Sequence, residues 1–201
     1  MELSSNYQSI TDSINSFVTS QVGTSAGWTN LPGQLTKAVA SSAGYVWGIS
    51  QNTLWSSALP STGNWQDQVV AEDASMCLDI ETDDTYVYLL YASTDGSTKL
   101  GVGSAIPGQA TWNFIAAPSG ATRIFSTHTY IWSQDASNNK QKCAKPCTMS
   151  NWIPASDPAN IKITSASATS LYGVDASGTP QKTDELLQTG WSSVPALGSA
   201  K

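Results

Sequence analysis

The sequence is poor in charge: its 9 Lys and Arg and 15 Asp and Glu make up 12% of 201 residues, half the ~25% of an ordinary soluble domain. The few basic residues and the net charge of −6 argue against general binding to nucleic acid, which needs a basic surface to neutralise phosphates. The longest apolar run, Tyr86 to Ala92, has 7 residues, whereas a membrane-spanning helix needs ~18. We therefore expect neither a nucleic-acid partner nor membrane insertion.

Histidine and cysteine are scarce as well. The chain has 1 histidine, His128, and 3 cysteines, Cys77, Cys143 and Cys147. No second Cys or His pair accompanies Cys143 and Cys147, so the spacing argues against zinc. A local bridge between these two cysteines stays open, but an odd number of cysteines in a chain too long to need a disulfide framework favours free thiols. We expect no metal and no cofactor.

Motifs for catalysis are lacking. His128 lies in a short Ser-Thr-His-Thr turn, and no G-x-S-x-G or other nucleophile motif accompanies it. Asp79, Glu81, Asp83 and Asp84 raise the alternative of a calcium site, but the D-x-[DN]-x-[DN]-G loop that wraps a cation is missing. Carboxylate pairs for glycoside hydrolysis meet only in a fold and leave no local pattern. We predict that the chain is not an enzyme.

What the chain has in abundance is small hydroxyl residues and regularly spaced aromatic residues. A first series recurs every 37 to 47 residues and consists of Trp28, Trp65, Trp112, Trp152 and Trp191. A second series recurs every 40 to 44 residues and consists of Tyr7, Trp47, Tyr88, Trp132 and Tyr172. Two interleaved series with nearly one period indicate a structural repeat, and we expect both to pack repeat against repeat.

Each repeat predicts four short strands. A first strand leads to the strand that carries the second-series aromatic, a polar turn gives a third strand, and a fourth begins at the first-series Trp. The predicted first strands are Ala38–Ser41, Cys77–Glu81, Thr122–Ser126 and Ile161–Ser165. Four short strands per repeat, without a helical period, predict an all-β fold of the β-propeller class.

The two ends of the chain complement each other. Tyr7 begins a second strand, Phe17 to Gln21 form a third and Trp28 begins a fourth, so the N-terminal repeat lacks a first strand, which the tail after Trp191 supplies. We predict a single five-bladed propeller domain over 1–201, closed by a 3+1 composite blade that removes free sheet edges. The predicted repeats are 1–31 plus 195–201, 32–69, 70–115, 116–155 and 156–194.

The segment from Trp28 to Trp55, WTNLPGQLTKAVASSAGYVWGISQNTLW, resembles the repeat of tectonin-type β-propeller lectins. Only this repeat keeps the full pattern, since the Pro-Gly is absent after Trp65. Tectonin, tachylectins and fish-egg lectins bind glycans on microbial or cell surfaces, so the resemblance implies a non-catalytic glycan-binding protein. It also implies an extracellular or surface location, whereas Met1 to Val22 show no secretory leader and free thiols suit the cytosol, so the location stays open.

Two kinds of residue are candidate sugar contacts. Trp55 stands where we align Asn15, Gly96, Lys140 and Pro180 in the other repeats, so it is an aromatic that they lack. Polar residues in the predicted turns between second and third strands would ring one face of the propeller, and they are Asn52, Asp95, Asp135, Asn138 and Asp175. Planar acceptors and donors suit sugar hydroxyls, and repeated weak sites favour avidity. The alternative for Asp135 and Asp175 is an Asx turn.

Charge is unevenly distributed along the chain. No basic residue lies between Lys37 and Lys99, where 8 of the 15 acids fall, and the stretch that follows is basic. The ordinary interpretation is solvated loops. This uneven charge motivates the rival hypothesis for function, which is a structural or adhesive propeller that self-assembles through its acidic and basic blades. Self-association is left open.

Overall fold

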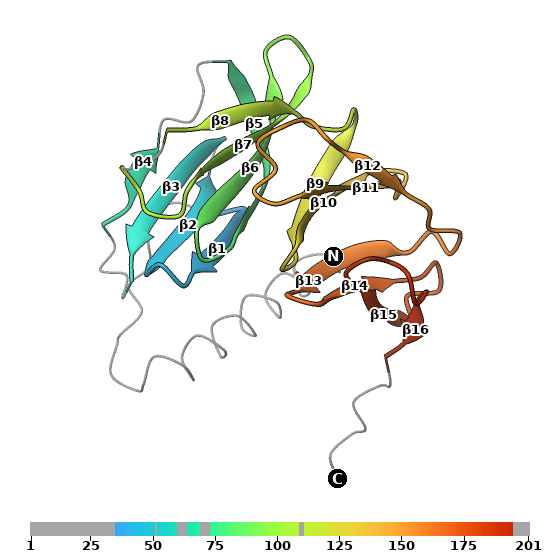
Figure 1. Ribbon diagram of the computed structural model, residues 1–201. Coiled ribbons are helices and arrows are strands. Elements are labelled where there is room, and N and C mark those ends of the chain that lie inside the picture. The colour runs from blue at the N-terminus through green and yellow to red at the C-terminus, as the bar shows by residue number, and fades with distance from the viewer. Residues whose placement is uncertain (1–34, 51, 60–63, 69–72, 109–110, 195–201) are drawn as a thin grey trace, which may run out of the picture. The chain divides into compact units, whose positions relative to one another are not determined.

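The computed structural model describes residues 35–50, 52–59, 64–68, 73–108 and 111–194, which all belong to the same compact unit (Figure 1). These residues form four antiparallel sheets, each of four strands in chain order, and contain no helix. Within this described part, accordingly, no helix is long and apolar enough to cross a membrane.

The strands are short, and each sheet contains four of them in the same order. Sheet 1 consists of β1 (Lys37–Ser41), β2 (Tyr45–Ser50), β3 (Thr53–Ala58) and β4 (Gln66–Gln68). Sheet 2 consists of β5 (Ala74–Thr82), β6 (Tyr86–Ser93), β7 (Thr98–Ser104) and β8 (Asn113–Ala116). Sheet 3 consists of β9 (Ala121–Ser126), β10 (Tyr130–Asp135), β11 (Lys140–Ala144) and β12 (Ile153–Ala155). Sheet 4 consists of β13 (Lys162–Ser167), β14 (Ser170–Val174), β15 (Pro180–Asp184) and β16 (Ser192–Ser193).

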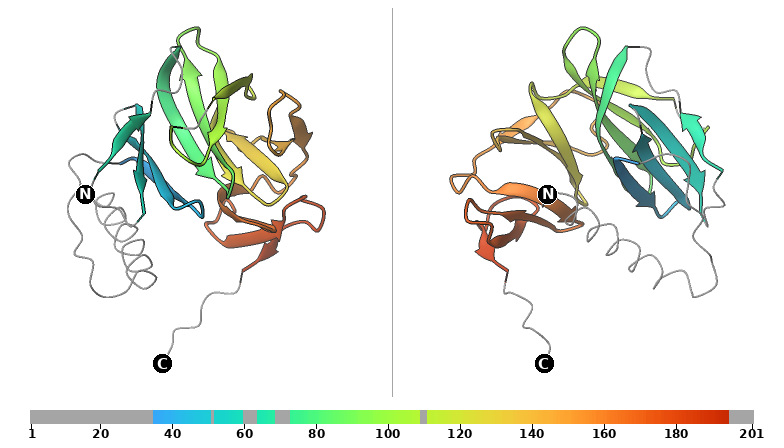
Figure 2. Two further views of the ribbon diagram at one scale, coloured as in Figure 1. Left: turned by 60° about the vertical axis from the view of Figure 1, so that its left-hand side comes forward. Right: turned by 180° about the vertical axis from the view of Figure 1, so that it is seen from behind.

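The predicted repeat of four strands is confirmed in these four sheets. The predicted first strands correspond to β1, β5, β9 and β13, and the first strands of consecutive sheets pack against one another (Figure 2). Each described first-series Trp directly precedes a fourth strand, as expected. The composite fifth blade predicted from residues 1–31 and 195–201 lies outside the described residues.

A residue in the left-handed backbone region stands in each turn between second and third strands. It is Asn52 (φ 65°) in sheet 1, Gly96 (φ 82°) in sheet 2, Asn138 (φ 64°) in sheet 3 and Gly178 (φ 83°) in sheet 4. Gly and Asn are the residues that enter this region most readily. Backbone geometry therefore accounts for Asn52 and Asn138, which the sequence had suggested as sugar contacts.

The aromatic series pack between neighbouring sheets, as predicted. Trp47, Tyr88 and Trp132 on the second strands are completely buried. The Trp47 indole donates from Nε1 to the carbonyl of Ala105, directly after β7, at 3.2 Å and meets Trp112 edge-on at 6.5 Å between ring centroids. The first-series Trp side chains that the structure describes, which are Trp65, Trp112, Trp152 and Trp191, are only partly buried.

The glycine at position 103 gives Trp112 the space to lie on strand β7. A Cβ at this position would come within 2.9 Å of the Trp112 ring. We expect Gly103→Ala to lower the free energy of unfolding by about 1–3 kcal/mol, because overpacking forces the indole out of place. Urea unfolding measures this loss. In a Trp112→Phe background the same Ala should cost less, and a Gly103→Ala protein as stable as the wild type would contradict the packing described.

The acidic stretch of sheet 2 is paired with basic residues of the neighbouring sheets. Lys37 of sheet 1 lies 2.5 Å from Asp79 and 2.9 Å from Glu81. The backbone N–H of Ile124 in sheet 3 donates to Asp79 at 2.9 Å, and Arg123 approaches the same carboxylate at 3.8 Å. Burial raises the pKa of Glu81, and Lys37 opposes this shift.

A second ion pair links sheet 3 to sheet 2, where Lys145 lies 2.8 Å from Asp83. Asp84 accepts a hydrogen bond from the Ser42 hydroxyl of sheet 1. Part of the uneven charge along the sequence thus forms ion pairs between sheets of one chain, at Asp79, Glu81 and Asp83. The carboxylates of the calcium alternative already have partners of these kinds.

Two of the three cysteines are bonded to each other, whereas the sequence favoured free thiols. Cys143 and Cys147 form a disulfide with Cα atoms 5.5 Å apart, so the expectation of free thiols was wrong for this pair. The chain bends back after β11, where the Cys147 N–H donates to the Ala144 carbonyl, and this brings the two sulfurs together. Cys77 is free, its thiol donates to the Asn52 carbonyl at 3.1 Å, and burial raises its pKa to about 11.

Candidate ligand groove between sheets 2 and 3

The polar residues predicted as sugar contacts occupy equivalent turns in the four sheets. Asn52 lies between β2 and β3, Asp95 between β6 and β7, Asp135 and Asn138 at the turn between β10 and β11, and Asp175 between β14 and β15. They therefore sit at the same end of their sheets, as predicted from the repeat. Each residue stays in its own turn.

The carboxylates at these turns act as Asx caps. Asp135 Oδ1 accepts from the N–H groups of Ser137 at 2.9 Å and Asn139 at 2.8 Å. Asp175 Oδ1 accepts in the same way from Ser177 and Thr179, each at 2.9 Å. The Asx-turn alternative is thus confirmed for both residues.

These hydrogen bonds stabilise the charged form of the carboxylates. Ser177 and the N–H of Thr179 hold the pKa of Asp175 below its ordinary value. Burial would raise the pKa of Asp135, but the hydrogen bonds from Asn139 and Ser137 outweigh it and the pKa is lowered. A ligand at these turns would have to share acceptors that the protein already uses.

The other polar groups at these turns differ in their hydrogen bonds and in their exposure. Asp135 Oδ2 accepts from Asn139 Nδ2 at 2.7 Å, and Asn138 Oδ1 accepts from Gln134 Nε2 at 2.8 Å. Asp95 is exposed and accepts through Oδ1 from the N–H and hydroxyl of Ser97. Asn52 is exposed as well.

Trp55 lies on β3, half-buried, opposite Gly48 on β2 and Asp67 on β4. The register of the sheets corrects its alignment: the positions equivalent to Trp55 are Gly101, Gln141 and Gln181, not Gly96, Lys140 and Pro180. Because none of these is aromatic, Trp55 remains an aromatic that the other described sheets lack.

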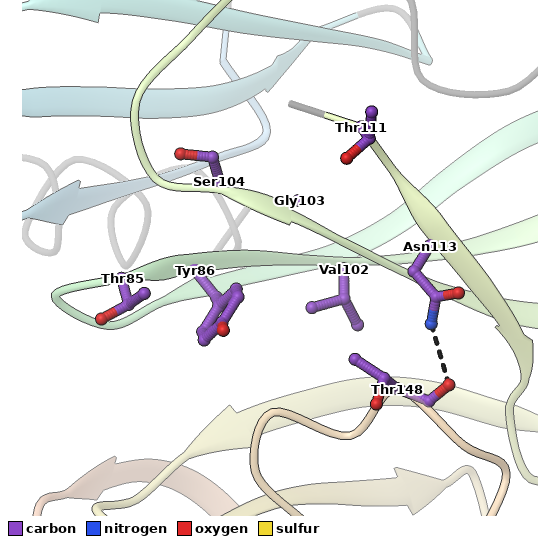
Figure 3. Close-up of a pocket in the computed structure, with 8 residues that line it drawn as sticks. All are labelled: Thr85, Tyr86, Val102, Gly103, Ser104, Thr111, Asn113 and Thr148. Carbon is purple, nitrogen blue, oxygen red and sulfur yellow. Dashed lines mark hydrogen bonds between the residues drawn. The ribbon is translucent and has the colours of Figure 1, made fainter. Parts of the chain in front are cut away.

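A groove of about 270 Å³ opens at the opposite end of the strands, between sheets 2 and 3 (Figure 3). Its lining residues are Thr85, Tyr86, Val102, Gly103, Ser104, Thr111, Asn113 and Thr148. They offer five hydroxyl groups, one carboxamide and one aromatic ring, and none of them is charged. The groove is thus neutral and rich in hydrogen-bonding groups.

Each wall of the groove is fixed by neighbouring elements. Tyr86 begins β6 and pairs with Ser104 on β7. Asn113 begins β8 and its Nδ2 donates at 2.9 Å to the Thr148 carbonyl in the loop after β11, which joins the two sheets across the groove (Figure 3). The positions of the walls therefore do not depend on a ligand.

Asp83 holds the turn that leads into the groove. Its Oδ1 accepts from the N–H groups of Thr85 at 2.8 Å and Tyr86 at 2.7 Å. Burial raises its pKa, but Lys145 and these N–H donors outweigh burial, so the pKa lies below its ordinary value. The Tyr88 hydroxyl donates to Asp83 Oδ2 at 3.1 Å, and burial raises the Tyr88 pKa, which keeps this phenol protonated.

The groove lining offers hydrogen-bonding groups and one aromatic ring rather than acidic or basic side chains. Its lining holds no Asp, Glu, His, Lys or Cys that could transfer a proton or attack a substrate. Among the described residues, no group of three or more His, Cys, Asp or Glu side chains could hold a metal ion. Its volume of about 270 Å³ lies just below the ~300 Å³ at which typical ligand pockets begin, which leaves room for one small ring rather than a long ligand.

Sequence reasoning missed the groove residues. Tyr86 and Thr148 line the same groove although they are distant in the sequence and come from different repeats. A local signal existed only in Tyr86, which precedes the second-series Tyr88 by two residues, as Tyr45 precedes Trp47 and Tyr130 precedes Trp132. That pattern indicates an aromatic position that recurs in three repeats. It does not indicate in which repeat the ring borders a groove.

Comparison with known proteins gives likeness in fold only. No protein-family model matches the chain, and no curated protein sequence matches it. The computationally designed protein Ika4 is similar in structure, with a TM-score of 0.52 and 15% identity over 79% of this chain and 99% of that one. Yeast RCC1 (Prp20), solved with Kap60 bound to it, has a TM-score of 0.53 and 7% identity over 78% of this chain and 45% of that one.

A lectin from Aleuria aurantia, solved in complex with α-methyl-L-fucoside, matches at a TM-score of 0.49 and 12% identity, over 75% of this chain and 55% of that one. The chain thus spans about half the length of yeast RCC1 and of the Aleuria aurantia lectin. Taken together with the sheet topology, the likeness to Ika4 identifies the fold as an all-β β-propeller of four-stranded blades, of which four are described.

Proposed function

We propose that this chain is a non-catalytic carbohydrate-binding propeller whose groove between sheets 2 and 3 holds one neutral sugar ring. The observation that carries the proposal is the lining of the groove, with five hydroxyls, one carboxamide and the Tyr86 ring and no charged side chain. Sugar hydroxyls both donate and accept, as these side chains do, and the C–H face of a pyranose packs against an aromatic ring.

Two side chains have distinct roles in this proposal. Tyr86 supplies the apolar surface for the sugar ring. Asn113 uses Nδ2 to hold the Thr148 carbonyl, and its Oδ1 accepts from a sugar hydroxyl. Since the Asn113–Thr148 hydrogen bond exists without a ligand, little ordering of the groove is needed on binding, which favours affinity.

We propose that the protein works as a closed five-bladed propeller of the tectonin type, spanning 1–201. Trp47, Ile49 and Leu54 pack toward sheet 2, so Gly48 and Trp55, at alternating positions, face the other side of sheet 1. The complementary ends in the sequence support this closure.

We also propose weaker glycan contacts near the turns between the second and third strands. Asn52 and Asp95 are the most exposed candidates, Asp135, Asn138 and Asp175 share acceptors with their own turns, and Trp55 adds an aromatic surface. Weak contacts of this kind act through avidity on a dense glycan surface. The rival, self-assembly through acidic and basic blades, is less favoured because Asp79, Glu81 and Asp83 pair with bases of the same chain.

A glycan array printed at dilute and dense spacing tests the proposal. We expect binding to at least one neutral glycan, reduced about tenfold or more by Tyr86→Ala, which corresponds to about 1.4 kcal/mol. Tyr86→Phe keeps the ring and should lose less. Asn113→Ala should also weaken binding, since it removes both the acceptor and the clamp on Thr148.

His128→Ala is the matched control, because His128 is exposed and lies outside the groove. Loss of binding in Asp95→Asn and Trp55→Ala, with Tyr86→Ala unaffected, would transfer the site to the turn end of the sheets. Absence of binding at both printing densities would refute the proposed function.

A further inference from the structure

We infer that one strand position, together with the aromatic residue opposite it, decides which junction between sheets is open to a ligand, and that Val102 opposite Tyr88 leaves the junction between sheets 2 and 3 open. The inference rests on the proposed function. The position is the cross-strand partner of the second-series aromatic on the third strand. It is held by Ser56 opposite Trp47, Val102 opposite Tyr88, Lys142 opposite Trp132 and Lys182 opposite Tyr172.

At the junction between sheets 3 and 4 this position holds Lys142. Its Nζ lies 4.8 Å from the centroid of the Tyr130 ring and 5.2 Å from that of Trp132. The same Nζ donates at 3.3 Å to the carbonyl of Leu186, in the loop of sheet 4. The lysine therefore crosses the junction, covers two aromatic faces and ties sheet 3 to sheet 4.

At the junction between sheets 2 and 3 the equivalent aromatic residues are Tyr86 and Tyr88. Val102 is too short to cover the Tyr86 ring and carries no donor that could reach the next sheet. Lys145 Nζ lies 5.6 Å from the Tyr88 centroid, but it is held by Asp83 at 2.8 Å and by the Ser126 hydroxyl at 2.8 Å. The space that Lys142 occupies at the next junction is thus left as the groove.

The junction between sheets 1 and 2 is filled in a different way. Ser56 is short, like Val102, but the Trp47 indole donates to the Ala105 carbonyl and packs against the edge of Trp112. A short residue on the third strand therefore leaves a groove at the junction only where the second-strand aromatic does not itself bind the neighbouring sheet. Tyr88 meets this condition because its hydroxyl turns to Asp83.

The inference is tested by exchanging the two side chains. The probe is the methyl glycoside of the sugar that gives the strongest array signal, titrated by calorimetry into the full chain. Val102→Lys should weaken binding in the groove at least tenfold by filling it, and Val102→Met should do the same without adding a charge. Lys142→Val should open the equivalent groove over Tyr130 and Trp132 and raise the stoichiometry by one site per chain.

Lys142→Met is the matched control, since it removes the charge but keeps a long side chain over the rings, so the stoichiometry should stay that of the wild type. Circular dichroism confirms folding, and Val102→Met carries the test if Val102→Lys does not fold. The inference would be overturned if the wild type bound the glycoside, Val102→Met bound it equally well and Lys142→Val kept the wild-type stoichiometry. The proposed function would still stand in that case. A wild type that binds no glycoside would overturn both.

Discussion

Replacing Asp157 by Ala is expected to lower the free energy of unfolding by about 3–5 kcal/mol, because it leaves a buried ammonium group without its partner. Lys140 Nζ lies 2.6 Å from Asp157 Oδ2, and their side chains are 0% and 4% exposed. The same carboxylate accepts from the Ile161 N–H at 3.0 Å and from Trp191 Nε1 at 3.0 Å. One side chain thus joins sheet 3 to two parts of sheet 4.

A double-mutant cycle separates the charge pair from the other hydrogen bonds. Lys140→Met and Asp157→Asn each leave one buried charge, so each should destabilise the protein strongly. The double variant leaves none and should recover part of the loss, with a coupling energy of about 1–3 kcal/mol. Chemical denaturation measures all four proteins.

Lys162→Met, at an exposed lysine on β13, controls for the general effect of removing a positive charge. The interpretation of Asp157 as the link between sheets 3 and 4 would be wrong if Asp157→Ala were as stable as Lys162→Met.

Replacing Asp79 by Ala should cost about 2–3 kcal/mol, mainly because the Ile124 N–H of sheet 3 loses its acceptor in the interior. Asp79 is buried, and it also accepts from the Ile80 N–H at 3.0 Å. The cost stays below that of Asp157→Ala, since Lys37 keeps Glu81 as a partner at 2.9 Å. Urea unfolding with and without salt measures the loss.

The next junction provides a matched comparison for Asp79. Gln134 Oε1 accepts from the Ile163 N–H at 2.8 Å and so performs the same task without a charge. Gln134→Ala should therefore destabilise the protein comparably, whereas Asp79→Asn, which keeps an oxygen acceptor, should lose less than Asp79→Ala. Equal losses in Asp79→Asn and Asp79→Ala would show that the charge, not the hydrogen bond to Ile124, matters.

The period of the aromatic residues was sufficient to predict the strands, because each sheet is a local meander whose strands follow one another in the sequence. Trp47 falls on β2 and Trp112 directly before β8, as the repeat required. The alignment of Trp55 failed because the hairpins differ in length: Trp55 follows Trp47 by 8 residues, whereas the equivalent Gly101 follows Tyr88 by 13. Counting residues from the aromatic then misses the cross-strand partner.

The groove could not be predicted from the sequence, since it depends on how two repeats meet. Val102 reads as an ordinary strand residue until the register places it opposite Tyr88. Thr148 reaches the groove only because the loop after β11, whose Cys147 is bridged to Cys143 on β11, runs beside sheet 2. The turn carboxylates, by contrast, were recognisable as Asx caps, because this interaction is local.

The contrast between Asp79 and Gln134 bears on how a chain of similar repeats assembles in the right order. Misassembly of neighbouring units is a common failure of repeat proteins. A sheet docked beside the wrong neighbour would leave Asp79 without Lys37, or the Ile163 N–H without the Gln134 carbonyl. Because an unpaired buried group is costly, the differing contacts discriminate against the wrong order. Sequence divergence between the repeats thus encodes the identity of each neighbour.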